Sequence, residues 1–218
     1  MAFIVDLETV AIPDAGSFVE PVSAPANYKK PEAIAAYIAE AEQAQRDKAA
    51  LYPWTARIVA LGWCETPGDA VQVTVANHDT IEATMLREFG QRIVEERGVV
   101  ADLITFNGLA FDLPVLMARA RLLGVKFPTL DISRFRSPHP DLMKILTFDG
   151  AIQARSLKWY ARRFGLDVSD AFGGKEIAQL YEDQNWDAIK AHCASDVNLT
   201  RQLAERLGII KGRHVVTS

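Results

Sequence analysis

The chain has 218 residues, of which 49% are hydrophobic and 24% charged, and this composition excludes a protein that is mainly disordered. The formal charge of -4 excludes binding of nucleic acid by bulk positive charge alone, although a local basic groove or a phosphate contact through a metal ion stays open. No apolar run approaches the roughly 20 residues that a membrane span requires.

The cysteines and the N-terminus indicate a cytoplasmic protein. The two cysteines, Cys64 and Cys193, are too few to staple a domain of this size and lack the spacing of a zinc site, so free thiols are expected. The N-terminal residues carry no basic region and reach an acid at Asp6, which argues against a secretory signal. We therefore expect a cytoplasmic location and no membrane partner.

The first third of the chain predicts strands separated by one long helix. Residues 3–9 begin as an apolar run and end in alternating polar and apolar residues. This pattern is typical of a strand whose start is buried and whose end is open to solvent. Three prolines mark residues 11–27 as a loop, and residues 31–51 have the composition of an amphipathic helix. Two more strands are predicted at 58–63 and 70–75, and the Pro-Gly-Asp cluster between them favours a hairpin.

The rest of the chain is mostly helical in pattern. One further strand is predicted at 103–106, and helices are predicted at 80–97, 112–123, 156–164, 177–181 and 186–207. Thr80 is the expected cap of the first of these helices and Gly98 its expected end. A less regular stretch contains His139, which has no matching partner and is interpreted as incidental. The pattern predicts a mixed α/β class, with residues 1–218 as one domain and 28–52 as a helical insertion.

Asp6 and Glu8 lie two residues apart on the first predicted strand. Because side chains alternate along a strand, both carboxylates are expected on the same face. Two like charges that lie close together are unfavourable without a cation. A solvated strand end is the simpler interpretation, but a short strand that begins with Phe-Ile-Val is typical of a central, covered position.

Two further acids and a histidine come from predicted helices. Asp112 lies near a helix N-terminus, where the helix dipole favours an acid, so by itself it is more often a capping residue than a ligand. His192 lies four residues before Asp196 and shares its helical face, as a solvated ion pair also would. The four acids come from three segments and suit hard divalent ions such as Mg²⁺. Two such ions can clamp the attacking and leaving oxygens of a phosphodiester.

Three segments, in order, resemble the motifs of the DEDD (DnaQ-like) 3'-5' exonucleases. Residues 3–9 are similar to the first motif, in which Asp-x-Glu-Thr closes the first strand. Residues 104–114 carry the Asn-Gly-x-x-Phe-Asp pattern of the second motif, and residues 191–197 resemble the third. Residues 52–62 and 139–143 resemble a subgroup related to the proofreading domain of family-B DNA polymerases. The resemblance covers nearly the whole chain.

This resemblance implies an RNase H-like α/β fold, with a mixed five-stranded sheet and helices on both faces. It implies four ligands for two Mg²⁺ or Mn²⁺ ions: Asp6, Glu8, Asp112 and Asp196. Activated water would attack the last phosphodiester of DNA, with single strands favoured, and release a nucleoside 5'-monophosphate. The expected partners are a nucleic acid with a free 3' end and a polymerase or repair protein. An RNA-directed exonuclease and a non-catalytic nucleic-acid-binding domain remain as alternatives.

His192 marks a departure from the family pattern. Family members carry Tyr four residues before the last Asp or His five residues before it, whereas this chain has His at four. One residue turns a helical side chain by ~100°, so the two positions are not equivalent. His192 shares the face of Asp196, and a neutral imidazole can act as general base near pH 7. We favour this active role because all four acids are present, and the alternative is a weakened or non-catalytic protein.

Other residues of the motifs are candidate substrate contacts. Leu7 and Phe111 are candidates for packing on the terminal base or sugar, although such residues are more often core. Thr9 is a candidate contact to the 3' end, and Asn107 contacts either the substrate or the backbone of its own turn. Lys175 is a candidate phosphate contact or an ordinary helix-start lysine. A basic region is expected either to guide a strand or to form solvated helix faces: Arg134, Arg136, Arg155, Lys158, Arg162 and Arg163.

Overall fold

A mixed four-stranded sheet forms the centre of the protein. The computed structural model describes residues 1–18, 20–66, 68, 70–94, 98–169 and 176–210. The strands lie in the order β3-β2-β1-β4. Their bounds are Ala2–Ala11 for β1, Ala56–Thr66 for β2, Gln72–Val75 for β3 and Asp102–Ile104 for β4. β2 pairs antiparallel with both β1 and β3, as the predicted hairpin requires, and β4 is parallel to β1.

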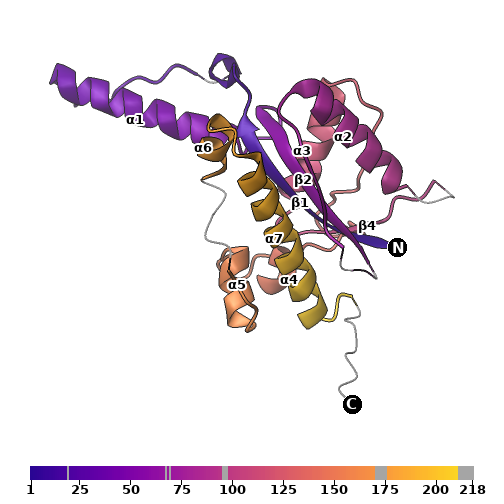
Figure 1. Ribbon diagram of the computed structural model, residues 1–218. Helices are drawn as coiled ribbons and strands as arrows, with labels where there is room; N and C mark the ends of the chain where they lie inside the picture. Colours follow the sequence, from indigo (N-terminus) through magenta and orange to yellow (C-terminus); the bar gives the residue numbers. More distant parts are fainter. Residues whose placement is uncertain (19, 67, 69, 95–97, 170–175, 211–218) are drawn as a thin grey trace.

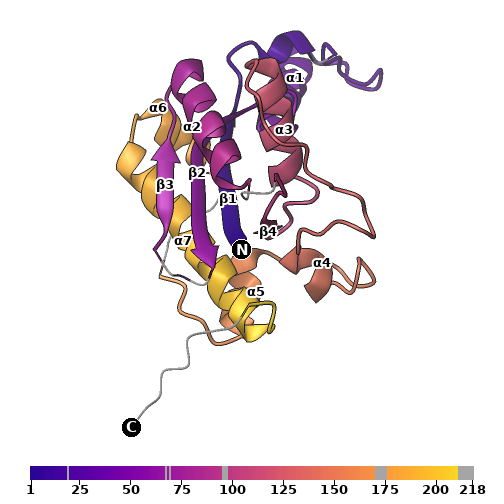
Figure 2. The same ribbon diagram turned by 90° about the vertical axis from the view of Figure 1, so that its right-hand side faces the viewer.

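Helices cover both faces of this sheet (Figure 1). One face carries α2, Asp79–Arg92, and α3, Asp112–Leu122. The other face carries α4, Leu142–Leu146, α5, Leu157–Arg163, α6, Ile177–Glu182, and α7, Trp186–Arg206. Figure 2 looks onto the face covered by α2, with α7 behind the strands. None of the helices in the described ranges combines the length and the apolar character that crossing a lipid bilayer demands.

The alternation of β1 assigns its side chains to these two layers. Phe3 and Leu7 are buried in the hydrophobic cluster that includes residues of α2 and α3. Ile4 is buried in the cluster that includes residues of α5 and α7. β1 lies between β2 and β4, so the Phe-Ile-Val start does mark a central strand. By the same alternation, Asp6 and Glu8 are directed toward the α7 layer.

The segment between β1 and β2 projects from the sheet as an arm (Figure 1). It contains the 3-10 helix η1, Ala15–Phe18, and α1, Pro31–Ala49, which agrees with the helix predicted at 31–51. The three buried hydrophobic clusters contain none of the described residues from 12 to 55. The C-terminal end of α1 is held to the sheet because Thr9 Oγ1 donates to the Ala50 carbonyl oxygen at 2.7 Å.

The bounds of α2 differ from the prediction. Its N-cap is His78, with no side-chain capping hydrogen bond, so Thr80 lies inside the helix and is not its cap. The helix also ends well before Gly98. The reason is that the Ala101 N–H donates to the Ile93 carbonyl oxygen at 2.8 Å, which turns the chain back toward β4. Tertiary pairing therefore overrides the helical periodicity at this end.

The described residues form four strands, whereas five were expected. The segment beside β4 makes only an isolated parallel bridge, between Thr105 and Asp141. Two prolines in this segment lack the N–H group that a regular ladder requires. His139 Nδ1 instead accepts the Leu103 N–H at 3.2 Å, and burial lowers the pKa of His139, which favours the neutral ring. His139 is thus part of the sheet edge, and its interpretation as incidental was wrong.

Candidate functional site

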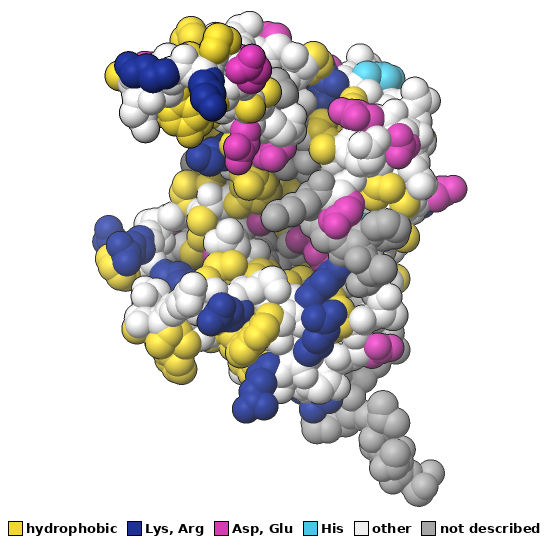
Figure 3. All heavy atoms as spheres, turned by 90° about the vertical axis from the view of Figure 1, so that its left-hand side faces the viewer, with side chains coloured by type: hydrophobic (Ala, Val, Ile, Leu, Met, Phe, Trp, Pro, Cys, Tyr) yellow, Lys and Arg dark blue, Asp and Glu magenta, His cyan; other side chains and the backbone are white. Residues whose placement is uncertain are grey.

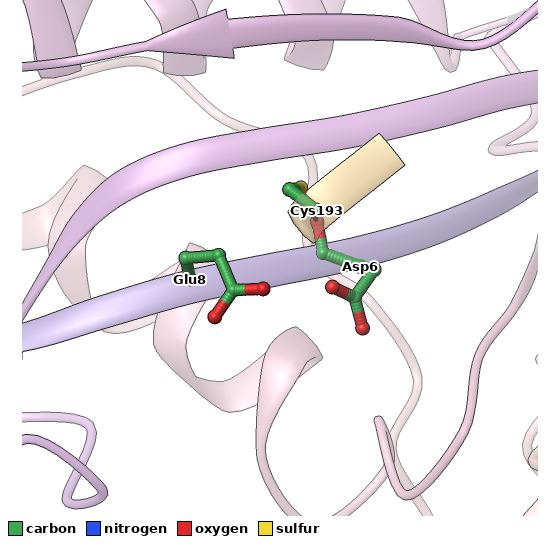
Figure 4. Close-up of side chains that lie close together, drawn as sticks. All are labelled: Asp6, Glu8 and Cys193. Carbon is green, nitrogen blue, oxygen red and sulfur yellow. Dashed lines mark hydrogen bonds between the residues drawn. The ribbon is translucent and has the colours of Figure 1, made fainter. Parts of the chain in front are cut away.

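Asp6 and Glu8 lie on the same side of β1. Figure 4 shows both carboxylates on that side, with Cys193 of α7 next to them. Glu8 is buried and Asp6 is half-buried. The strand register is continuous from Ala2 to Glu8 and shifts only between Glu8 and Thr9. The alternation that the sequence predicted therefore holds for the two acids.

α7 contributes the other half of this acidic cluster. His192 Nε2 lies 3.4 Å from Glu8 Oε1 and 3.9 Å from Asp196 Oδ2. His192 is 2% exposed, and the Asp196 side chain is partly buried. The spacing of four residues does place His192 and Asp196 on one helical face, as predicted. That face is turned toward β1, so the pair is not a solvated surface pair.

Gly62 of β2 allows α7 to lie this close to the sheet. Gly62 is the strand partner of Asp6. A Cβ atom at this position would lie 2.7 Å from Cys193 Sγ and 2.8 Å from Val197 Cγ2, both on α7. Any side chain here would push α7, with His192 and Asp196, away from Asp6. Sequence reasoning missed this residue, because a glycine inside a strand signals close backbone approach only once the partner is known.

Asp112 connects the second motif to the first. The chain leaves β4, turns through Asn107, whose φ is +70°, and enters α3 at Asp112. Asp112 is buried, and its Oδ1 accepts the Leu7 N–H at 3.2 Å. The pairing of β1 with β4 has already ended at Ile4. The Asp112 carboxylate therefore accepts a hydrogen bond from a β1 N–H group that lies past the end of the β1–β4 pairing. It also lies at the N-terminus of α3.

The pKa values show that these acids are crowded and poorly solvated. Burial raises the pKa of Asp6 well above its usual range, and the charges of the three other acids, Glu8, Asp112 and Asp196, raise it further. Burial also raises the pKa of Asp112 to about 7, although the hydrogen bond from Leu7 acts in the opposite direction. A cluster with these properties binds protons or cations in preference to remaining fully ionised.

The donor atoms fit hard divalent cations. One oxygen each of Asp6 and Glu8 and the Cys193 sulfur lie within 4.8 Å of one another, and so do donor atoms of Glu8, His192 and Asp196. Cys193 is a poor candidate ligand because burial raises the pKa of its thiol, and its Sγ donates to the Asp6 carbonyl oxygen at 3.8 Å. The remaining carboxylate oxygens are the ligands that Mg²⁺ and Mn²⁺ prefer.

Three of the candidate substrate residues, Leu7, Thr9 and Phe111, lie next to these acids in the chain but have structural contacts of their own. The Leu7 side chain lies in the core, so its main contribution to the site is the N–H group that Asp112 accepts. Thr9 donates its hydroxyl to the arm, and Phe111 packs against the core cluster while remaining partly exposed. Asn107 is partly exposed at the left-handed turn. Lys175 lies outside the described residues.

Asp141 fixes the turn that precedes Asp112. Its Oδ1 accepts the Asn107 N–H at 2.9 Å and its Oδ2 accepts the Leu109 N–H at 3.2 Å. The same carboxylate caps α4 by accepting the Met143 N–H. Sequence reasoning named Asp141 only as part of a motif. The signal was available, because an Asp directly before a short apolar run is a typical N-cap.

The α7 side of the protein is hollowed. Figure 3 shows acidic side chains at the floor of a hollow, between the projecting arm above and the α4–α5 region below. Asp6 and Asp196, the less buried of the four acids, belong to this side of the sheet. A cavity of about 940 Å³ lies elsewhere, beside the C-terminal end of α1, and is lined by Ile12, Trp54 and Arg57 among others. None of the four acids lines it.

Fold and site together define a mixed α/β protein with an acidic cluster that has the donor set for divalent cations. Residues 52–214 match the model of a family described as "predicted 3'-5' exonuclease related to the exonuclease domain of PolB", and the chain belongs to this family. The expected relation to family-B polymerases is therefore confirmed. The matched residues include Asp112 and Asp196, whereas β1 with Asp6 and Glu8 precedes them. Among curated proteins, none matches the chain.

Among solved structures, 46 chains match this chain. One is the family B DNA polymerase from the hyperthermophilic archaeon Pyrobaculum calidifontis, with a TM-score of 0.60 and 17% sequence identity. The match covers 94% of this chain and 24% of the polymerase chain. At this identity the likeness shows the fold alone.

Proposed function

We propose that the protein is a metal-dependent 3'-5' exonuclease that removes nucleoside 5'-monophosphates from DNA, with single strands preferred. The observation that carries this proposal is the clustering of Asp6 and Glu8 of β1 with donor atoms of α7, including Asp196. Asp112 lies close enough for its charge to raise the pKa of Asp6. The family supports the reaction class. A mixed sheet with a parallel fourth strand and helices on both faces also supports an RNase H-like classification.

The proposed ligands are the four acids: Asp6, Glu8, Asp112 and Asp196. Divalent cations bound there would supply an activated water and offset the negative charge that develops on the phosphodiester. The protein contributes a rigid arrangement of oxygens, since β1 is central in the sheet and Asp112 is hydrogen-bonded to it. The four carboxylates would repel a phosphate group until bound cations offset their negative charge. The phosphate would then be held through the cations. The net charge of -4 is therefore compatible with a nucleic-acid substrate.

His192 is proposed as the residue that accepts a proton from the attacking water. Its Nε2 atom is directed at the acidic cluster, 3.4 Å from Glu8 Oε1. A neutral imidazole can accept a proton near pH 7. The His192 side chain can reach the acidic cluster because Gly62 lets α7 approach β1 closely. A polymerase or repair protein that generates 3' ends is the proposed partner, in keeping with the family.

The test is degradation of 5'-labelled single-stranded DNA and of its RNA counterpart, each with Mg²⁺, Mn²⁺ or EDTA. The expected result is a ladder shortened from the 3' end, dependent on metal and faster on DNA. Asp6→Asn should abolish the ladder, whereas Glu88→Gln, an exposed acid on α2, should leave it unchanged. A faster ladder on RNA would support the RNA-directed alternative. Binding of 3' ends without any ladder in either metal would overturn the catalytic proposal.

A further inference from the structure

Positive charge is concentrated in one region of this acidic protein. Residues 131–163, here called the basic lobe, contain seven Lys and Arg against three Asp and Glu, a formal charge of +4 in a chain of -4. The basic lobe includes α4 and α5 and lies below the acidic hollow. Figure 3 shows Lys and Arg side chains gathered there together with exposed hydrophobic side chains. Such a combination is typical of surfaces that bind single-stranded nucleic acid.

The turn after α4 presents an exposed aromatic ring. Phe148 is 71% exposed, and its φ of +51° is unusual for a bulky residue. Asp149 and Gly150 also have positive φ. The turn is nevertheless fixed, since the Asp149 N–H donates to the Lys144 carbonyl oxygen at 2.9 Å and the Ile152 N–H donates to the Thr147 carbonyl oxygen at 3.2 Å. A strained turn that holds an apolar ring in water indicates a ligand contact.

A second exposed aromatic ring lies beside basic groups. Phe135 is 79% exposed, with the Arg134 guanidinium carbon 5.2 Å and Lys144 Nζ 5.6 Å from its ring centroid. Phe135, Phe148 and Lys144 line the same pocket of about 460 Å³. Lys144 Nζ is also 3.4 Å from Asp149, so part of its charge is offset, whereas Arg134 is exposed. Two rings and two cations thus occupy one continuous surface.

This surface continues to the turn that leads into Asp112. An adjoining pocket of about 380 Å³ is lined by Arg134, Lys144 and Ile152 of the basic lobe and also by Asn107 and Ala110 of the turn. Asp141 hydrogen-bonds the backbone of this turn and also caps α4, so the acidic site and the basic lobe are rigidly joined. A strand with its 3' end at the acids would pass Asn107 before it reaches the aromatic rings.

We propose that the basic lobe binds a single nucleic-acid strand upstream of its 3' end, with bases stacked on Phe148 and Phe135 and phosphates at Arg134 and Lys144. The proposal rests on the proposed function only for the location of the 3' end. Stacking on aromatic rings does not depend on sequence, as a general exonuclease requires. The excess of positive charge favours a nucleic acid over an apolar protein partner for these exposed rings.

The test measures binding of 5'-fluorescein-labelled dT20 by anisotropy in EDTA, where no hydrolysis occurs. Phe148→Ala is expected to weaken binding roughly 5- to 150-fold. Phe148→Trp, which retains a stacking surface, should restore it, and this separates stacking from a folding defect. Phe18→Ala is the matched control, because Phe18 is 65% exposed on η1, away from the lobe. Equal affinities of Phe148→Ala and the wild type would overturn the proposal.

The phosphate contacts are tested through the salt dependence of the same binding. Arg134→Gln should reduce the slope of log K against log[salt] by about 0.7, the value for one phosphate contact on a single strand. Arg87→Gln, an exposed charge on α2, should leave the slope unchanged. A slope equal to that of the wild type in Arg134→Gln would remove Arg134 from the proposed path.

Failure of this proposal can be distinguished from failure of the exonuclease proposal. If the wild type binds dT20 in EDTA and Phe148→Ala does not, yet no ladder forms with Mn²⁺, the lobe is supported and the exonuclease proposal fails. If a ladder forms and Phe148→Ala binds dT20 as tightly as the wild type, the exonuclease stands and the lobe proposal is overturned. If the wild type binds a protein partner at the basic lobe but does not bind dT20, the lobe proposal is also overturned.

Discussion

Asp112 is the residue whose protonation most clearly couples the site to stability. Burial raises its pKa from 3.8 to about 7. An acid with a raised pKa in the folded state retains its proton longer there than in the unfolded chain, so the free energy of unfolding falls as pH rises from about 4 to about 7. Asp112→Asn, which keeps an oxygen for the Leu7 N–H, is expected to show a smaller fall. Urea denaturation in EDTA across this pH range measures the difference.

Divalent cations provide the control for this pH effect. Mg²⁺ or Mn²⁺ should stabilise the wild type by binding ionised carboxylates in the folded state, and more so toward pH 7 than toward pH 5. Asp112→Asn should gain less from the same concentration of metal. If the wild type in EDTA loses no more stability between pH 4 and pH 7 than the variant does, Asp112 does not hold its proton as described.

The proposed role of His192 as a proton acceptor predicts how its substitution changes the catalytic rate. If it accepts the proton of the attacking water, His192→Ala should lower kcat by about 10²- to 10⁴-fold while metal-dependent stabilisation remains. His192→Tyr places at this position the residue that the family pattern carries there, so it should retain more activity than His192→Ala. Single-turnover assays over a pH series check both. A His192→Ala enzyme with the rate and pH profile of the wild type would make His192 a spectator.

The packing of α7 against β2 is the contact between elements that sets the site geometry. Gly62→Ala would place a methyl group 2.7 Å from Cys193 Sγ and 2.8 Å from Val197 Cγ2. Relief of this overlap requires α7 to shift, with an expected loss of about 1–3 kcal/mol in the free energy of unfolding. Exonuclease activity should fall further than stability does, because the shift moves His192 and Asp196 relative to Asp6. Denaturation and the ladder assay measure the two effects.

Gly16→Ala is the matched control for this substitution. Apart from its chain neighbours, no atom of the described residues lies within 4 Å of the added methyl group at Gly16, so both stability and activity should remain close to those of the wild type. If Gly62→Ala behaved in the same way as Gly16→Ala, the close approach of α7 would not control the site.

Most elements could be predicted from the sequence because local periodicity specifies them. The period of two in β1 correctly placed Asp6 and Glu8 on one face, and the period of α7 placed His192 and Asp196 together. The end of α2 and the sheet edge at His139 could not be predicted. There the outcome depends on partners far away in the chain, the Ala101 N–H in one case and the Leu103 N–H in the other.

The candidate site shows the same division between local and long-range information. The identities of the four acids followed from motifs, but their proximity depends on Gly62 and on the hydrogen bond from Leu7 to Asp112. Both involve residues more than 100 positions apart in the chain. The role of Asp141 was missed for the opposite reason: its capping pattern is local, but its effect on the Asn107 turn requires the fold.

At the scale of the whole molecule, the arm and the basic lobe lie at opposite ends of the sheet (Figure 1). The arm contributes nothing to the three hydrophobic clusters among the described residues. Its two ends are close together, because Ala15, Gly16 and Ala49 line one cavity of about 380 Å³. We propose on this basis that the arm is an insertion, and that the sheet, its helices and the acidic site form without it.

Replacement of residues 17–48 by a short Gly-Ser linker tests this independence. The variant should unfold cooperatively in urea, with a free energy of unfolding within about 1 kcal/mol of the wild type, equivalent to roughly 2–4 °C in Tm. Ile189→Ala, in a fully buried position of the α7 layer, should by contrast lose about 2–5 kcal/mol. The linker variant should also bind dT20 in EDTA as the wild type does, because the proposed strand path lies at the basic lobe. A broad, non-cooperative transition would show instead that the arm is part of the core, and normal unfolding with lost dT20 binding would place the strand on the arm.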